Sequence, residues 1–416
     1  MQTTWSIAKK LCFLFLFFYL FLYTNSSQFI STFLLEPFWR IVIPLFADLT
    51  GYVIGRVTLP NGSGDTTYNY YQVLLFVLLA AVLTVLTLII DRKRLNYDTL
   101  LYGLSILIRY YIAVQMIYYG LGKLYYLQFQ FPSAAQLDQE LGDFSPMGLL
   151  WTFMGYSKGY TMFTGALEFI AGILLLFRKT TTLGALTTFG MMLNVMMLNY
   201  CYDVPVKLLS THLVLMACFL IAIDGKRLLN FFILNQPIQH YLIPDIIPER
   251  YQIAKKVIKG LVIMSYMGFM FFNMNTMSKE YGSKAPKPYF AGKYVIEDFQ
   301  RFSGDSLTLD TSKNNWKVFY QTRKNHAMIK TDNNSITGVN YFQMEADTAK
   351  QLFKIKQQHH PSYYWLKYES MGADRFMVYG KFQSDSLHFT MMKEDINKRL
   401  LVNRGFHWIS ESPFNR

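Results

Sequence analysis

Cysteine, charge and the motifs of soluble enzymes are all scarce in this sequence of 416 residues. The three cysteines, Cys12, Cys201 and Cys218, form no C-x-x-C pair and fall at different expected depths. This spacing argues against a disulfide framework and against a dithiol relay. The sequence also contains no Rossmann fingerprint, P-loop, haem-binding C-x-x-C-H or nucleophile elbow. Soluble-type cofactor chemistry is therefore unsupported.

The low charge content indicates the class of protein. Charged residues make up 16% of the chain, against about a quarter in typical soluble domains, while 52% of residues are hydrophobic and 17% aromatic. This composition predicts a membrane protein. The net charge of +13 does not point to nucleic acid, because in the hydrophobic part Lys and Arg cluster at helix ends, where they report topology.

Long apolar stretches predict about seven membrane-spanning helices. They cover residues 11–23, 71–90, 99–119, 159–177, 181–200, 206–223 and 257–274. The first is short enough to be a signal-peptide apolar region; we favour a retained helix, because no A-x-A-like cleavage site follows. Successive spans must end on alternate sides of the membrane. Basic clusters occur at 92–94, 178–179, 226–227 and 255–256, which are the span ends that this alternation places in the cytoplasm. The topology predicts a bacterial cytoplasmic (inner) membrane protein with a cytoplasmic N-terminus and a periplasmic C-terminal domain.

The connecting segments carry their own signals. Residues 28–55 are amphipathic and interrupted by Pro37 and Pro44, which suits an interfacial or re-entrant segment on the outer face. Asp65 is placed to cap the helix that follows it. Residues 128–157 form a long outer loop of the kind that often serves as a functional lid. Residues 228–251 predict a linker on the cytoplasmic membrane surface.

The character of the chain changes after the last span. Period-two alternation at 293–297, 316–320, 363–368, 375–379 and 387–391 predicts one antiparallel β sandwich or small barrel, with a short helix around 346–352. The adjacent His359 and His360 fit a solvated loop better than a metal site. We therefore divide the chain into leading helices with the outer amphipathic segment (1–98), a four-helix core (99–227), linker and last span (228–278) and an extracytoplasmic β domain (279–416).

The four-helix core contains a polar centre. Arg109 and Glu168 fall near the middle of adjacent spans, and a charge at membrane depth costs at least about 2.5 kcal/mol unless protein or water shelters it. Gly165 and Gly172 flank Glu168 at helical spacing, so this face admits a neighbouring helix closely. Arg109 and Glu168 therefore either neutralise each other structurally or form the floor of a site.

Further polar side chains gather toward the outer ends of these helices. The full set of candidate ligand-binding residues is Arg109, Lys123, Glu168, Asn194, Asn199, Asp203, Lys207 and His212. They predict a pocket that opens outward and holds an oxygen-bearing head group, such as that of a quinone or another amphiphile, with Met and aromatic side chains around its tail. The alternatives are packing hydrogen bonds for the asparagines, membrane anchoring for the lysines and a satisfied core position for His212.

The central block resembles the DoxX-like family of bacterial membrane proteins. The resemblance is carried by 119–123 (YGLGK), 128–132 (QFQFP), 142–148 (GDFSPMG), 150–155 (LWTFMG), 165–168 (GALE) with Gly172, 180–184 (TTTLG) and 199–207 (NYCYDVPVK) with His212. The tail 404–411 (RGFHWISE) is similar to the ends of long members that carry extra helices and an exported β domain. The two leading spans, the seventh span and the exterior domain depart from short members.

The resemblance implies a four-helix core related to DoxD-type subunits of thiosulfate:quinone oxidoreductases, to the methylamine-utilisation protein MauE and, more remotely, to vitamin-K-dependent carboxylases. Those relatives share a redox or quinone connection. The leading hypothesis is a quinone-like or amphiphile-binding protein in a redox or envelope process, with Arg109 and Glu168 at the pocket floor and Asn194 and His212 binding oxygen atoms or relaying a proton. The alternative is a non-enzymatic scaffold of an envelope complex whose β domain recruits a periplasmic or membrane partner. A transporter is less supported, because repeated halves and interrupted helix pairs are not evident.

Overall fold

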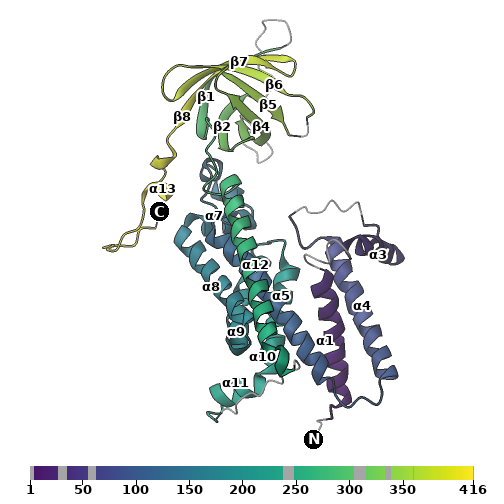
Figure 1. Cartoon of the computed structure of the whole chain (residues 1–416). Coiled ribbons are helices and arrows are strands. Elements are labelled where there is room, and N and C mark those ends of the chain that lie inside the picture. The colour runs from purple at the N-terminus through teal and green to yellow at the C-terminus, as the bar shows by residue number, and fades with distance from the viewer. Residues whose placement is uncertain are drawn as a thin grey trace. The chain divides into compact units, whose positions relative to one another are not determined.

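The computed structural model describes residues 4–26, 35–54, 62–237, 248–303, 315–332, 339–358 and 360–415. The chain consists of apolar helices followed by a β barrel (Figure 1). Contacts divide it into two compact units, one of Met1–Tyr125 with Gly159–Met274 and one of Tyr126–Lys158 with Asn275–Arg416. The outer loop expected at 128–157 thus belongs to the same unit as the barrel.

The first unit contains the membrane-spanning helices. Six helices of the described chain are long and apolar enough to cross a membrane: α1 (Ile7–Ser26), α4 (Thr67–Ile90), α5 (Asp98–Leu124), α8 (Lys158–Leu176), α9 (Thr181–Cys201) and α12 (Gln252–Glu280). A seventh span is reached if α10 (Lys207–Ile223) and α11 (Gly225–Phe232), which meet at a bend of 73°, count as one. The polytopic helical bundle predicted from hydropathy is confirmed. Helix α11 replaces the first residues of the expected surface linker.

A short amphipathic helix precedes α4. Helix α3 (Glu36–Leu49) contains Pro44 and buries Trp39, Ile43 and Ala47, which lie four residues apart on one face. The Trp39 ring meets Phe76 of α4 edge-on at 5.0 Å between centroids. The amphipathic character expected for this segment is confirmed for its described part.

Asp65 caps a different helix from the one expected. Thr66 and Asn69 form the capping box at the start of α4. The Asp65 carboxylate instead accepts hydrogen bonds from the backbone N–H groups of Lys207 (2.7 Å) and Leu208 (2.9 Å), at the start of α10. The prediction was wrong because sequence proximity gave no sign that the turn before α4 lies against the start of α10.

The β domain is a closed antiparallel barrel. Its strands are β1 (Gly292–Ser303), β2 (Trp316–Arg323), β3 (His326–Thr331), β4 (Val339–Asp347), β5 (Leu352–Gln357), β6 (Tyr364–Ser370), β7 (Arg375–Phe382) and β8 (Asp385–Glu394). Each strand pairs with the next, and β1 pairs with β8 to close the ring. The expected helix at 346–352 is wrong: these residues end β4, turn and enter β5. His359 lies outside the described residues.

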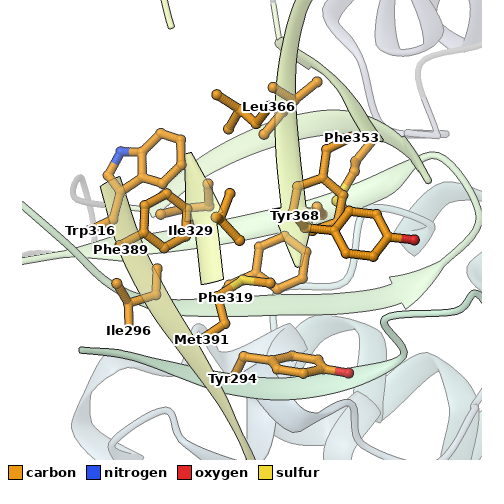
Figure 2. Packing of buried hydrophobic residues seen from close by; sticks show 14 of the residues in the cluster. Tyr294, Ile296, Trp316, Phe319, Ile329, Phe353, Leu366, Tyr368, Phe389 and Met391 are labelled. Carbon is orange, nitrogen blue, oxygen red and sulfur yellow. The ribbon is translucent and has the colours of Figure 1, made fainter. Parts of the chain in front are cut away.

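Aromatic and aliphatic side chains fill the barrel interior. Trp316, Phe319, Phe353, Tyr368 and Phe389 converge there with smaller apolar residues (Figure 2). The void among the described core residues is about 10 Å³, roughly the room for one water. Side chains therefore fill the barrel interior around these described residues.

The loop within the barrel unit contains the helices α6 (Ala134–Leu137) and α7 (Pro146–Tyr156), which the sequence did not predict. Asp138, just after α6, accepts hydrogen bonds from the Tyr320 hydroxyl (2.9 Å), the Lys293 ammonium (2.6 Å) and the Arg399 guanidinium. Lys293 and Arg399 also pair with Glu394 on β8. This network joins the loop to the barrel wall.

Candidate functional site

Helices α5 and α8 touch backbone to backbone inside the first unit. A Cβ atom added to Gly120 would lie 2.6 Å from the Phe169 nitrogen and 2.8 Å from the Gly165 carbonyl oxygen. A Cβ on Gly165 would lie 2.6 Å from the Lys123 Cβ. Only glycine permits so close a crossing, which is the packing mode of small residues in membrane helices. The small face predicted around Glu168 is confirmed.

A salt bridge lies at this crossing. The Lys123 ammonium is 2.7 Å and 2.5 Å from the two carboxylate oxygens of Glu168. The two residues are only 6% and 2% exposed. Desolvating an ion costs several kcal/mol even after relaxation, so each charge depends on the other. The structure therefore pairs Glu168 with Lys123, not with Arg109 as expected.

The difference has a geometric cause. Helix α5 continues to Leu124, so Lys123 lies inside the last helical turn rather than beyond the expected end of the span at residue 119. Arg109 lies 14 residues earlier, which is about 21 Å along a helix axis. Its guanidinium is 3.4 Å from the Thr181 hydroxyl at the start of α9 and stacks over the Tyr110 ring at 4.8 Å. Arg109 and Glu168 therefore do not form a common floor.

His212 on α10 forms a second polar group with α1. Its Nδ1 is 2.6 Å from the Leu208 carbonyl oxygen, which can only accept, so Nδ1 carries the proton. Nε2 lies 2.5 Å from the Tyr19 hydroxyl oxygen, and in the neutral tautomer it accepts a hydrogen bond from that hydroxyl. The Tyr23 ring stacks on the imidazole at 3.7 Å between centroids, with 4° between the planes. His212 is thus held between the Leu208 carbonyl and two tyrosines.

Gln115 on α5 faces the same region. It is 1% exposed, and neither amide atom has a hydrogen-bond partner among the described residues. Tyr111 and Tyr119 lie four residues to either side, on the same helix face. Both of them lie near Tyr23, so this face of α5 lies toward Tyr23, which stacks on His212. We name Tyr19, Tyr23, Tyr111, Gln115, Tyr119 and His212 the tyrosine–histidine cluster.

Both polar atoms of the Gln115 amide are unsatisfied within the described residues. A buried amide without partners costs about 1–3 kcal/mol, and such groups are few in native proteins. Tyr119 also lies near Glu168, so the cluster extends toward the salt bridge. The arrangement can donate a hydrogen bond from the Gln115 Nε2 to a ligand oxygen and accept one at the Gln115 Oε1. It can also present flat ring faces to a planar head group.

The remaining sequence candidates lie elsewhere. Asn194 is exposed on α9. Asn199 donates to the Val206 carbonyl at 3.4 Å, and Asp203 pairs with Lys207 at 2.8 Å. These last contacts stabilise the turn between α9 and α10. The set therefore separates into the Lys123–Glu168 pair, His212 in the cluster, a turn-stabilising group, and the isolated Arg109 and Asn194.

The sequence reasoning missed four tyrosines and Gln115. Tyr19 and Tyr23 were hidden in the first apolar run, although their spacing of four residues places two hydroxyls on one helix face. Tyr111, Gln115 and Tyr119 continue the same spacing on α5. Side chains with a polar end group that recur every four residues within an apolar helix are the signal that indicates this set of residues.

Known proteins share the central part of the chain. The family model described as DoxX matches residues 104–200. The uncharacterized protein YwoB of Bacillus subtilis (strain 168) is 33% identical over 126 residues, which is 30% of this chain and 79% of that protein. No solved structure shows a significant match. Lys123, Glu168 and Gln115 themselves fall within the matched region, and the chain is a membrane protein of the DoxX family.

Proposed function

We propose that this protein binds a quinone-like amphiphile within its helix bundle, with the head group at the tyrosine–histidine cluster, as part of a redox or envelope process. The observation that carries the proposal is the Gln115 side chain, which is buried and has both amide atoms unsatisfied among the described residues. A bound oxygen-bearing head group would satisfy it and recover the free energy lost by burial.

The residues fit a quinone. A quinone carbonyl accepts hydrogen bonds, and Gln115 Nε2 is a buried donor without a partner among the described residues. The stacked rings of Tyr23 and His212 show that flat groups pack closely here. A quinone supplies reversible uptake of two electrons and two protons when bound. His212 Nε2 and the Tyr19 hydroxyl bonded to it can pass a proton, and the Lys123–Glu168 pair supplies two further protonatable groups in the bundle.

The proposed location is the bacterial cytoplasmic membrane, with the N-terminus in the cytoplasm and the barrel in the periplasm. Support comes from the basic residues at 92–94, 178–179, 226–227 and 255–256, which alternation of the spans puts on one side. Reporter fusions at residues 94, 157 and 415 test this topology. Cytoplasmic activity of the fusion at 415 would contradict it.

Extraction and mass spectrometry of copurified small molecules test the ligand. We expect a quinone or related amphiphile from the wild-type protein in mild detergent and its loss from Gln115→Leu and His212→Leu. Asn194→Leu is the matched control, because it removes a polar side chain from an exposed position of α9. Added short-chain ubiquinone and menaquinone analogues should raise the Tm of the wild type and of Asn194→Leu only. Equal retention and equal Tm shifts in all four proteins would overturn the proposal.

A second candidate function is a non-enzymatic scaffold whose β domain recruits a periplasmic protein. The observation that favours it is the C-terminal segment, where Phe406, Trp408 and Ile409 are 77%, 91% and 78% exposed. Exposed clusters of large apolar residues mark interaction sites. Affinity purification of the full chain and of a chain ending at Asn403 discriminates. A stoichiometric protein lost on truncation, with no copurified amphiphile, favours the scaffold.

A further inference from the structure

The outer wall of the barrel contains a polar hollow of about 390 Å³. It is lined by Asn325, His326, Gln343, Met344, Glu345, Lys354 and Tyr363. We propose that this hollow binds one or two sugar rings of a carbohydrate. The proposal is independent of the ligand of the helix bundle.

The hollow follows from unequal strand lengths. The ladder between β3 and β4 stops at the pair Ala327↔Phe342. Strand β4 continues to Asp347, and that extension is paired only with β5. The turn between β2 and β3, with Asn325 and His326, lies beside the extension and leaves a notch in the wall. Met344, which is 1% exposed, lines the notch from the core side.

Hydrogen-bonding capacity at the notch is partly unused, although Gln343 Oε1 already accepts a hydrogen bond from the Tyr363 hydroxyl at 3.4 Å. Glu345 faces Lys354 in the strand register, but the Lys354 ammonium lies 4.4 Å from the centre of the Tyr363 ring instead. Within the described chain, the Glu345 carboxylate makes no hydrogen bond or ion pair, and the Asn325 side chain makes no hydrogen bond. These groups are available to a ligand.

The chemistry of the lining selects the ligand class. A carboxylate accepts, an ammonium donates and the amides of Asn325 and Gln343 do both, which matches hydroxyl groups that donate and accept on neighbouring carbons. One acidic and one basic side chain nearly balance, so the hollow does not favour phosphate or another strong anion. Tyr363, which lines the hollow and is 46% exposed, supplies an aromatic ring against which the C–H face of a pyranose can pack.

An extended peptide added to the free edge of β4 is the competing occupant. It would bind through backbone groups and depend little on Glu345 or Gln343. A sugar depends on those side chains, because a ligand hydroxyl loses its partner when one is removed.

Calorimetric titration of the full chain in detergent with tetramers of N-acetylglucosamine, glucose in β-1,4 linkage and glucose in α-1,4 linkage tests the proposal. We expect at least one to bind, with affinity falling about tenfold or more in Glu345→Gln and Gln343→Ala. Glu369→Gln is the matched control, because Glu369 is an exposed strand carboxylate that pairs with Lys367 and Tyr379 away from the hollow.

Binding unchanged in Glu345→Gln, or no binding of any tetramer at millimolar concentration, would overturn the proposal. So would binding of an unstructured peptide that the tetramers do not displace. Far-UV circular dichroism of each variant confirms that the barrel is folded.

Discussion

The Lys123 ammonium and the Glu168 carboxylate meet where α5 and α8 cross with their backbones in contact, and both are nearly inaccessible to solvent. Gly120 and Gly165 allow the two helices to approach closely. The charged side chains therefore pair at the crossing, where the packed helices shield them. The close contact of the helices therefore places the two charges within bonding distance of each other.

Removing one charge should be more harmful than removing both. Lys123→Met leaves a buried carboxylate without its cation, which costs about 3–5 kcal/mol. The double variant Lys123→Met/Glu168→Leu replaces the pair with apolar groups and should recover most of that loss. Thermal unfolding in a fixed detergent measures the three proteins. Equal destabilisation by the single and double variants would show that the charges are not energetically paired.

Gly120 should not tolerate even a methyl group. Alanine places Cβ 2.6 Å from the Phe169 nitrogen, which cannot move without separating α5 from α8. We expect a loss of at least about 1–3 kcal/mol, the usual cost of overpacking. Gly122→Ala is the control on the same helix, since nothing lies within 4 Å of its Cβ. It should be neutral or stabilising by up to about 1 kcal/mol through helix propensity. A similar fall in Tm for both variants would contradict the close crossing.

The sequence predicted what depends on local pattern. Hydropathy located the spans, and Gly165 and Gly172 identified the close-packed face of α8, because both signals lie within one helix. The partner of Glu168 was wrong because it depends on the register between two helices and on α5 ending at Leu124 rather than at residue 119. Two residues that the sequence predicts at the same depth in the membrane need not face each other in the bundle.

The sequence did not predict the tyrosine–histidine cluster, for a related reason. His212 was a candidate, but its partners come from α1, nearly 190 residues earlier in the chain. In the β domain, strands with strong aromatic alternation were found, whereas β3, β4 and β5 were not. Their outward positions carry lysine and glutamine, as in Lys354 and Lys356, and the apolar positions between them are few. The closure of the barrel depends on which strands pair with one another, so no single segment of the sequence predicts it.

Barrel stability should fall at high pH through Tyr320. Its burial, followed by the negative charge and hydrogen bond of Asp138, raises the pKa of the Tyr320 hydroxyl above its ordinary value of 10.0. A raised folded-state pKa means that the stabilisation is fully present below pH 10 and is lost as pH rises beyond it. Tyr320→Phe should lower stability at pH 8 and show a shallower decline between pH 10 and 11. Denaturant unfolding of the full chain at each pH measures this, with the exposed Tyr341→Phe as control. Parallel pH profiles for Tyr320→Phe and wild type would contradict the assignment.

Asp138→Asn should loosen the outer loop from the barrel. The amide keeps the shape of the side chain but removes the charge that pairs with Lys293 and Arg399, and hydrogen bonds to charged groups contribute about 1.5–3 kcal/mol. Local opening should become roughly 10- to 150-fold more frequent, since 1.4 kcal/mol is a factor of ten. Hydrogen exchange measured by mass spectrometry should therefore accelerate in 134–143, while the core strands keep their protection.

Asp143→Asn, at an exposed position of the same loop, should leave exchange unchanged. Because Glu394 still pairs with Lys293 and Arg399, the barrel wall itself should remain closed. Acceleration in β1 and β8 equal to that in the loop would show instead that Asp138 stabilises the barrel rather than the attachment of the loop to it.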